Sequence, residues 1–465
     1  MLRISNHHVS KIISVLFLLE VLILLVSVYL GIAIRFRDGM IGLSLSFDRI
    51  ILPASAFAVT MLFSMSALGM YQLKYREGFR NTLLRLMPAF ALGFGILTLV
   101  FYLLPDLYFG RGILGLVIII SATGILLARV LIYKSSEFGL LESRIIFLGS
   151  GALARECGEL AMHNIAYHKY NIVGYVPVAK EETCIAPANL LPNDESLTAL
   201  TAKHNVSEII VSVQNRRGGN LPIKELLDCK LYGVKVTDAA TFFEREACQI
   251  RVDSLQPSWL VFGTGFDQSF LRAFCKRSFD LVVSLVIFTV SIPAMLITAL
   301  CIYLEDRGPI LYKQERVGKD GQPYMVLKFR SMRNDAEKAG KPQWAKSNDP
   351  RTTRIGAIIR KLRIDELPQI LNVLKGEMSF VGPRPERPFF VQQLNEQIPF
   401  YNVRHSIKPG ITGMAQVRYP YGASVEDAVQ KLQYDLYYVK NNSLFLDILI
   451  LIDTLQVVLL GKGAR

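Results

Sequence analysis

Cysteine motifs are missing from this sequence. Its six cysteines stand at positions 157, 184, 229, 248, 275 and 301, and no two of them have CxxC spacing. This absence argues against a disulfide framework, so we expect reduced thiols in a cytosolic setting. The chain also has no finger motif, no RNP-type motif and no repeated aromatic and basic platform. Its net charge of +13 therefore does not indicate nucleic acid as a partner.

Charged residues are also missing from long parts of the chain. The hydrophobic fraction of 51% and the mean hydropathy of +0.33 exceed what soluble cores need, so part of the apolar surface should face lipid. Four stretches meet or approach the ~20 apolar residues that cross a bilayer, and we expect Arg129 to extend the last one by snorkelling. Inside the first stretch, Glu20 is either a functional-site candidate or a side chain that faces neighbouring helices. The four stretches are Ile12–Ile34, Ile50–Tyr71, Leu86–Leu104 and Ile113–Leu127.

Basic residues beside these stretches predict their orientation. The third loop holds only Arg111, whereas the second loop is crowded with Lys74, Arg76, Arg80 and Arg85. The positive-inside rule therefore places the second loop, both ends of the bundle and everything after Lys134 in the cytoplasm. The first loop mildly favours the opposite orientation, because it holds Arg35, Arg37 and Arg49.

Residues 135–266 alternate strand-like and helix-like segments, which is typical of an open α/β domain. Strand-like runs lie at 145–148, 172–176, 208–213 and near 233–236. Gly149 and Gly151 follow the first run, as in loops that hold a nucleotide pyrophosphate at a helix N-terminus. The third position of that motif is Ala154, and no acid ends the second run to hold a ribose. The pattern fits either a nucleotide site or a structural or regulatory Rossmann-like module.

A fifth apolar segment determines the topology of the last part. Leu281–Leu304 contains 24 consecutive uncharged residues with Pro293 at the middle, and on length alone it would span. Proline kinks a helix, and Ser291 can satisfy the carbonyls that the kink frees. We therefore expect a re-entrant helix, bent at Ser291–Pro293, that leaves through the leaflet it entered. A kinked crossing is the alternative, and it would put residues 305–465 outside.

An acid pair in a basic setting is the strongest chemical signal. In "RKLRIDELPQILNVLKGEMSFVGPRPERP", residues 360–388, Asp365 and Glu366 precede a helix-like run with Pro368 in its first turn and Gly376 beyond its end. The helix dipole and the nearby arginines favour ionised carboxylates. Neighbouring helix positions point about 100° apart, so we expect one carboxylate to attack and the other to bind a metal ion. Taken alone, Asp-Glu-Leu-Pro is also an ordinary helix cap.

Basic side chains around the pair suit a phosphorylated substrate. Lys328 and Arg330 lie on and just after the second of two strand-like runs, and Arg363 precedes the acid pair. Arg384 and Arg387 are fixed between prolines, so their guanidinium groups lose little entropy when they bind phosphate. Attack of a carboxylate on a pyrophosphate is opposed by repulsion between anions, which Mg²⁺ and arginines reduce.

From about Lys276 to the C-terminus the chain resembles the bacterial sugar transferases, which are monotopic phosphoglycosyl transferases. The shared segments are "KRSFDLVVSLVIFTVSIPAMLITAL", "KFRSM", "RKLRIDELPQILNVLKGEMSFVGPRPE", "RHSIKPGITGMAQV" and "YDLYYVKNNSLFLDI". A four-span front followed by a Rossmann-like domain resembles the long-form members that start exopolysaccharide or O-antigen repeat units. Family members usually have Ser directly before Pro, whereas Ile292 separates Ser291 from Pro293 here.

The resemblance implies that a hexose 1-phosphate moves from a UDP-hexose, with glucose or galactose as the family-level guess, to polyprenyl phosphate. Asp365 would be the nucleophile that forms a phosphosugar intermediate and releases UMP, and Glu366 would be the partner acid associated with Mg²⁺. It also implies a re-entrant helix over residues 276–304. We further expect Lys408, in a glycine-rich loop, and Arg418 just after it to approach the nucleotide; an ordinary turn is the alternative for this loop.

For each of three features of the C-terminal part, the sequence is compatible with two roles. Tyr434, Tyr437 and Tyr438 suit a membrane interface or a packed core. Residues 443–460 are apolar but contain two aspartates, so they should lie on the membrane or pack against the anchor. His405 is a candidate ligand or base, and an ordinary surface residue is the alternative that we favour.

Together these patterns predict a membrane α plus α/β protein. We expect a four-span transmembrane bundle at 1–134, an open Rossmann-like α/β domain at 135–266 and an α+β catalytic domain at 267–465. The protein would lie in the inner (cytoplasmic) membrane as a multi-pass homo-oligomer with its soluble domains in the cytoplasm. The partners would be UDP-hexose, polyprenyl phosphate and the lipid bilayer. The alternatives are a membrane-anchored NAD-dependent nucleotide-sugar dehydratase, which would need a full dinucleotide fingerprint and a Tyr-xxx-Lys, and a non-catalytic scaffold of polysaccharide assembly.

Overall fold

Two units make up the chain, residues 1–3 with 8–247 and residues 4–7 with 248–465. The computed structural model describes residues 2–4, 7–9, 11–36, 47–71, 79–137, 143–163, 170–178, 182–192, 195–213, 221–252, 266, 269–333, 351–420, 422 and 424–459. At the N-terminus, β1 (Leu2–Ile4) and β2 (His7–Val9) form a two-stranded sheet. The expected three domains, with boundaries at 134 and 266, stay a prediction.

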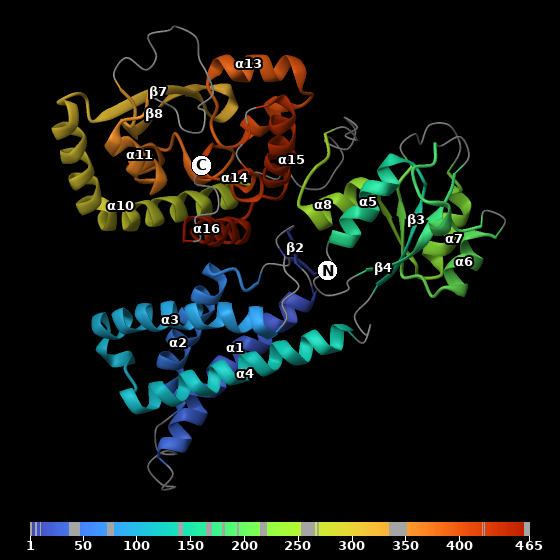
Figure 1. The fold of residues 1–465 in the computed structure, drawn as a ribbon, viewed down its shortest axis with the longest axis horizontal. Helices are drawn as coiled ribbons and strands as arrows, with labels where there is room; N and C mark the ends of the chain where they lie inside the picture. Colours follow the sequence, from blue (N-terminus) through green and yellow to red (C-terminus); the bar gives the residue numbers. More distant parts are fainter. Residues whose placement is uncertain are drawn as a thin grey trace. The chain divides into compact units, whose positions relative to one another are not determined.

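Four apolar helices follow in the first unit (Figure 1). They are α1 (Lys11–Arg35), α2 (Phe47–Ala67), α3 (Phe79–Leu103) and α4 (Arg111–Glu137), with the short 3-10 helix η1 (Pro105–Leu107) before α4. Leu24, Phe57, Leu97 and Val117, one from each helix, belong to one buried core. Each helix contains a stretch long and apolar enough to cross a bilayer, as predicted. The protein is therefore a membrane protein with several candidate spans.

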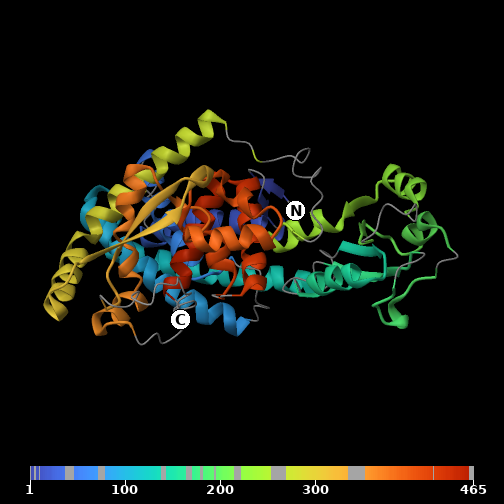
Figure 2. The ribbon, with the colours of Figure 1, turned by 90° about the horizontal axis from the view of Figure 1, so that it is seen from above.

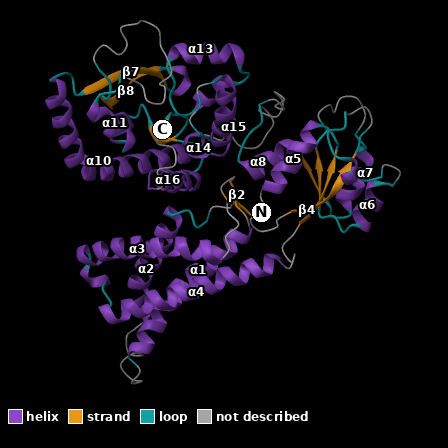
Figure 3. Ribbon diagram, viewed as in Figure 1, coloured by secondary structure: helices purple, strands orange, loops and turns teal. Residues whose placement is uncertain are grey.

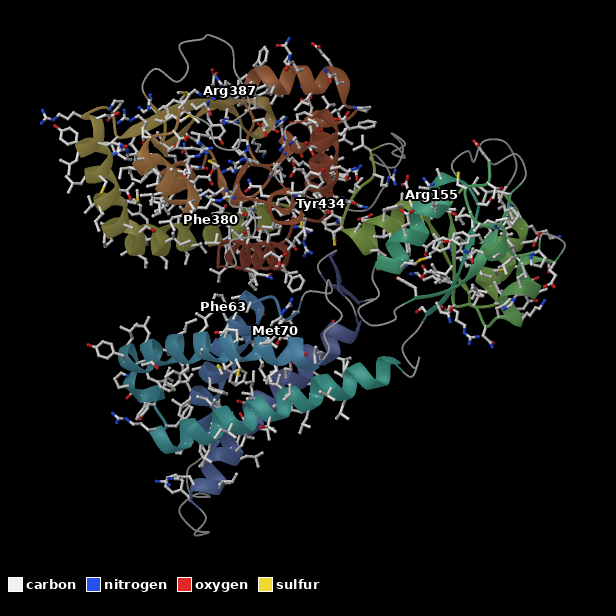
Figure 4. The ribbon with its side chains drawn as sticks, in the orientation of Figure 1. Phe63, Met70, Arg155, Phe380, Arg387 and Tyr434 are labelled. Carbon is white, nitrogen blue, oxygen red and sulfur yellow. The ribbon has the colours of Figure 1, made fainter. Side chains whose placement is uncertain are left out.

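The inside of this bundle corrects the prediction for Arg129. Arg129 does not extend to a membrane surface; it is buried, and its Nε lies 2.6 Å from Oε1 of Glu20. Tyr71 donates its hydroxyl to Oε2 of Glu20 at 2.5 Å, and Arg129 also donates to the carbonyl of Met70 at 3.0 Å. Figure 4 labels Met70 among the helices of the bundle. Because a charge in an apolar interior needs a partner, Glu20 and Arg129 hold α1 and α4 together.

An all-parallel sheet forms the α/β part of the first unit, as the strand-like runs predicted. Its strands are β3 (Ser143–Leu148), β4 (Tyr170–Val176), β5 (Glu208–Val211) and β6 (Lys235–Asp238), in the order β4-β3-β5-β6. Helices α5 (Ala152–His163) and α8 (Ala239–Ala247) cover one face, and α6 (Leu197–Lys203) and α7 (Ile223–Leu231) cover the other (Figure 1). The short 3-10 helix η3 (Pro187–Asn189) follows β4. Both faces of the central strands are buried, which is why they read as continuous apolar runs.

The second unit begins with the long helix α10 (Phe270–Asp306), which contains Pro293. Figures 1 and 2 both show that α10 bends along its length. Large apolar side chains on it are exposed, among them Val282, Val290 and Leu300. Composition and length make α10 a fifth candidate span.

A mixed α and β body follows α10, and Figure 3 shows its strands in orange. The hairpin β7 (Leu311–Val317) and β8 (Pro323–Phe329) encloses η4 (Lys319–Gly321), and β9 (Ser379–Val381) pairs in parallel with β10 (Gly410–Thr412). The helices are α11 (Arg354–Lys361), η5 (Ile364–Glu366), α12 (Gln369–Lys375), α13 (Pro388–Gln397), η6 (Tyr401–Ser406), α14 (Met414–Arg418), α15 (Val425–Asn441) and α16 (Leu444–Leu459). One apolar core joins β8, α12, β9, α15 and α16.

Candidate active site

The acid pair lies on the short helix η5, just before α12. Arg363 begins this turn with φ +59°, a left-handed backbone that lets α11 end and η5 start in a new direction. Gly376 ends α12 at φ +89°, as its position after the helix-like run predicted. The pair therefore sits on a tight, fixed turn instead of a long helix.

Asn372 fixes α12 against strand β8. Its side chain is fully buried, accepts a hydrogen bond from the amide of Leu327 at 3.0 Å and donates one to the carbonyl of Met325 at 2.8 Å. Because both bonds go to strand backbone, they set the register between the helix and β8. This register brings Lys328, the next residue on the strand, to the acid pair.

Two cations hold the Glu366 carboxylate. Lys328 donates to its Oε1 at 2.9 Å and Arg384 donates to the same oxygen at 3.0 Å, while Nη1 of Arg363 lies 3.9 Å from Oε2. Burial raises the pKa of Glu366, but the charges of Lys328 and Arg384 outweigh it and hold this pKa well below its usual range. Glu366 is therefore ionised, as predicted.

Asp365 has a different environment. In the part of the chain that the structure describes, its carboxylate has no hydrogen bond or ion pair. Burial and the neighbouring Glu366 charge raise the pKa of Asp365 to about 6, against the opposing charges of Lys328, Arg360 and Arg384. The nearby cations favour the ionised form of Asp365, as we expected, but burial and the Glu366 charge oppose them. Desolvation and a like charge are stronger there than the cations.

The loop that carries Arg384 is held by its backbone. Gly382 donates to the carbonyl of Thr412 at 2.9 Å, and Gly410 donates to that of Pro383 at 3.0 Å. A side chain on either glycine would collide with the facing backbone, so the two loops need glycine here. Arg404, buried beneath, donates to the carbonyl of Arg384 at 2.9 Å and pairs with Asp435 at 2.8 Å.

The structure places the other predicted phosphate ligands outside this cluster. Arg330 is buried and forms an ion pair with Asp306 at the end of α10. Arg418 pairs with Asp453 of α16 at 2.9 Å. Lys408 lies near Arg277, Asp280 and Lys276, whose charges act on it, and burial lowers its pKa. Arg387 caps α13, and Figure 4 labels it near β7.

A comparison with known families decides the class of protein. The family described as "Bacterial sugar transferase" matches residues 271–461, which include α10 and the acid pair. A UDP-galactose-lipid carrier transferase of Erwinia amylovora is 32% identical over 352 residues, which cover 70% of each chain. The chain belongs to the bacterial sugar transferase family. The predicted membership is thereby confirmed.

Two other relatives match shorter parts of this chain. A UDP-N-acetylgalactosamine-undecaprenyl-phosphate N-acetylgalactosaminephosphotransferase of Aeromonas hydrophila is 43% identical over 240 residues, or 52% of this chain. The chain spans only about half of that relative, 56% of its length. An exopolysaccharide production protein of Rhizobium leguminosarum bv. phaseoli is 45% identical over 195 residues, 40% of this chain and 97% of the relative. Further relatives are named as glucose-1-phosphate transferases.

The beginning of α10 is bonded to the core of this sugar transferase. Arg277 donates to the last carbonyls of α12, those of Val373 at 2.6 Å and Leu374 at 2.7 Å. Lys276 pairs with Asp447 of α16 at 2.8 Å, and buried Asp280 accepts from Ser379 at 3.0 Å. We did not predict these roles from the sequence, although the charges in "KRSFD" before an apolar run were the available signal.

The end of α10 is bonded to the same body. Oε1 of Glu305 accepts the amide of Arg354 at 2.9 Å, at the start of α11, and Asp306 pairs with Arg330 after β8. Both ends of α10 therefore contact one body. The charge of Arg360 acts on Asp365. Arg360 begins the segment 360–388, but we did not predict it as a site residue.

Burial settles two of the open readings. Tyr437 and Tyr438 are fully buried, so they belong to the core. The expectation that His405 is a surface residue is wrong, because His405 is buried, and burial lowers its pKa to about 4. Residues 444–459 form α16, and its Asp447 is paired with Lys276, which agrees with packing against the anchor.

The acid pair fits Mg²⁺ as a metal that binds together with a diphosphate. The described residues contain no group of three or more His, Cys, Asp or Glu side chains that could hold a metal alone. Mg²⁺ is commonly bound by one or two carboxylates plus substrate phosphates, and Asp365 and Glu366 supply two carboxylates. Lys328 and Arg384 already occupy Oε1 of Glu366, which leaves its Oε2 and Asp365 as ligands.

Proposed function

We propose that this protein transfers a sugar 1-phosphate from a UDP-sugar to undecaprenyl phosphate, as the first membrane step of exopolysaccharide or O-antigen synthesis. One observation carries the proposal: of two adjacent, partly buried acids, Glu366 is held by Lys328 and Arg384, whereas the carboxylate of Asp365 has no hydrogen bond or ion pair among the described residues. An acid without hydrogen bonds keeps its lone pairs for attack, and its pKa of about 6 leaves it mostly ionised at neutral pH.

Asp365 would act as the nucleophile. Its carboxylate oxygen forms a bond to the β-phosphorus of the UDP-sugar, the bond from this phosphorus to the bridging oxygen breaks, and UMP leaves. The sugar phosphate is then an acyl phosphate on Asp365. A phosphate oxygen of the lipid carrier attacks the same phosphorus, and the carboxylate is released.

The cations lower the repulsion in both steps. Arg384 and Lys328 lie on one side of the acid pair, where they can neutralise the diphosphate while Glu366 holds them in place. When bound, Mg²⁺ would polarise the phosphoryl oxygens and screen their charge from the incoming carboxylate. Arg363, Arg387 and Lys408 remain proposed phosphate ligands. Arg330 and Arg418 also remain so if substrate binding rearranges their present ion pairs.

We also propose that α10 is re-entrant. As a straight helix its 37 residues would be about 55 Å long, well beyond the ~30 Å apolar thickness of a bilayer. Lys276 and Arg277 near one end and Glu305 and Asp306 at the other bond to the same soluble body, which a plain crossing could not allow. Pro293 lies between the two ends, and Ser291 is two residues before it. This puts Asp365 at the inner leaflet and the soluble parts in the cytoplasm.

The donor that we propose first is UDP-N-acetylgalactosamine, because the Aeromonas relative named for it is 43% identical over 240 residues. The relatives named for galactose and glucose make these sugars the comparison donors. A panel of the three UDP-sugars, each with undecaprenyl phosphate and Mg²⁺, should give the highest kcat/KM for UMP release with UDP-N-acetylgalactosamine.

The decisive experiment uses the full chain with this donor. UMP should form in a burst without lipid acceptor, and mass spectrometry of the trapped protein should find the phosphosugar on the peptide that contains Asp365. Asp365→Asn should remove both signals, whereas Lys361→Gln, on an exposed neighbour, should keep them. Undiminished UMP release by Asp365→Asn would exclude the mechanism.

A further inference from the structure

Helix α7 of the α/β part carries an exposed apolar stripe that the catalytic chemistry does not use. Ile223, Leu227 and Leu231 follow one another at intervals of four residues and are 73%, 54% and 76% exposed. Tyr232, which ends the helix, is 83% exposed. Large apolar side chains at this spacing form one face of a helix, and a face of this kind in water marks a site of interaction.

Lysines border the stripe on both sides. On a helix with 100° between residues, Lys230 lies about 20° before Ile223 and Lys224 about 20° beyond Leu231, and both are exposed. Among the described residues, neither lysine side chain has a hydrogen bond or ion pair. Helix α7 has two acids, and both lie outside the stripe. The carboxylate of Glu225 accepts the amide of Leu197 at 2.7 Å, and Asp228 lies a further 40° beyond Lys224. An apolar stripe between lysines is the pattern of helices that lie in a membrane interface.

The topology puts the end of this stripe at the sheet edge that is tied to the membrane. In the parallel sheet, Ile145, Glu208 and Lys235 are aligned at the amino ends of β3, β5 and β6. Tyr232 is three residues before Lys235, so it lies at this amino edge. The chain enters β3 at the same edge, and five residues lie between Glu137, where α4 ends, and Ser143, where β3 begins. Five residues reach at most about 20 Å, so a bilayer that contains α4 lies close to the amino edge.

Two further basic groups lie at this edge. Arg144 on β3 donates to the carbonyl of His204 at the end of α6 at 3.1 Å. Lys235 pairs with the buried Glu208 at 3.2 Å, and its side chain stays 60% exposed. Lysine and arginine near a bilayer surface are attracted to anionic head groups, and tyrosine is enriched at the same depth. A second copy of this chain would need acids opposite these lysines. The basic border therefore favours anionic lipid.

We propose that α7 docks the α/β part on the bilayer surface, with Leu227, Leu231 and Tyr232 at the level of the head groups and Lys224 and Lys230 against anionic lipid phosphates. This gives the α/β part a function that needs no bound nucleotide, because contact of α7 with lipid would fix the position of the α/β part relative to the membrane. The proposal does not depend on the chemistry assigned to Asp365.

The test uses the full chain in nanodiscs that contain a phosphatidylcholine with a photoreactive acyl chain, with or without phosphatidylglycerol. After irradiation, peptides that carry lipid are identified by mass spectrometry. We expect lipid on the peptide that spans 223–235, in addition to peptides of α10, and a higher yield with phosphatidylglycerol. No lipid on 223–235 while α10 is labelled would overturn the proposal.

Two variants separate the stripe from its border. Leu227→Glu with Leu231→Glu should remove lipid from 223–235 and leave the labelling of α10 unchanged. Lys224→Glu with Lys230→Glu should lower the yield at least about five-fold in phosphatidylglycerol discs and little in phosphatidylcholine discs. Arg155→Glu is the matched control, since this exposed residue of α5 lies just after the carboxyl end of β3 (Figure 4).

The remaining outcomes also decide the question. Amide exchange of β3 and β5 that equals wild type shows that the domain is folded in each variant. If amide exchange shows that the leucine variant is unfolded, the lysine variant decides the question, because it changes only exposed side chains. Unchanged lipid yield in the lysine variant, or chain-to-chain cross-links through α7 that need no lipid, would overturn the proposal in favour of a second copy.

Discussion

Asp365 and Glu366 are adjacent in the chain, yet their surroundings give them opposite proton affinities. Lys328 and Arg384 stabilise the charge on Glu366, and this charge in turn acts on Asp365 together with burial. One acid thus stays ionised and anchors the cations. The other titrates in the physiological range, where a general base or nucleophile is best placed.

This asymmetry predicts an acid limb in the pH profile of UMP release. The pKa of Asp365 is raised to about 6, so below that pH the acid is protonated and cannot attack. We expect kcat/KM to fall about ten-fold per pH unit below about pH 6 and to be level above it. The measurement is initial UMP release with subsaturating donor across the pH range. A level profile down to pH 4 would contradict this assignment.

Removal of the Lys328 charge should move the same limb. Lys328 lowers the pKa of Asp365, while Arg384 remains to keep Glu366 ionised. In Lys328→Gln the limb should therefore shift to higher pH, by about one unit. Lys361→Gln, which removes an exposed charge from the same segment, is the control and should leave the limb in place. A Lys328→Gln limb at the wild-type position would show that Lys328 does not act on Asp365.

At the scale of elements, the ion pair between α1 and α4 should dominate the stability of the bundle. Glu20 is fully buried against Arg129, so Glu20→Gln leaves an uncompensated buried charge and should cost about 3–5 kcal/mol. The midpoint of thermal unfolding of the full chain in detergent should fall accordingly. The double variant Glu20→Leu with Arg129→Leu should be more stable than Glu20→Gln, because it leaves no unpaired charge. Equal midpoints for wild type and Glu20→Gln would contradict the role of the pair.

Local patterns predicted these elements well, because length and hydrophobic periodicity are local properties. The four apolar helices and the parallel strands from 145 to 236 follow directly from them. Arg129 was misassigned because a basic residue near the end of an apolar run looks the same whether it snorkels or pairs, and its partner Glu20 is 109 residues away. His405 was misassigned for the same reason: its burial comes from tertiary packing.

The candidate site was predictable only in part. The segment 360–388 contains an acid pair with basic neighbours. The sequence shows which residues are charged, but it does not show which of them form ion pairs with one another. Lys328 and Arg384 meet Glu366, whereas Arg330 and Arg418 pair with Asp306 and Asp453. The difference between Asp365 and Glu366 depends on distances of a few ångströms, which no pattern in the chain specifies.

At the scale of the whole molecule, α10 decides which side of the membrane carries the chemistry. Sequence alone left a crossing and a re-entrant helix open, because both need a long apolar run with a proline. The bonds that join both ends of α10 to one soluble body are tertiary, and they favour the re-entrant helix. Since a UDP-sugar is a charged cytosolic solute, only that topology brings it to Asp365 without transport.

Cysteine labelling across α10 tests this topology. Cys184 is exposed and precedes α10, and Asp320 in η4 is exposed and follows it. The two sites are the native Cys184 and Asp320→Cys, the second in a Cys184→Ser background. In intact cells we expect an impermeant maleimide to modify neither site, and after the inner membrane is opened we expect it to modify both. Mass spectrometry of the peptide that contains each site measures the modification. The native Cys184 is a matched control, because among the described residues between the two positions α10 is the one candidate span. Labelling of Asp320→Cys in intact cells that spare Cys184 would mean that α10 crosses the bilayer, and the acid pair would then lie on the side without sugar nucleotide.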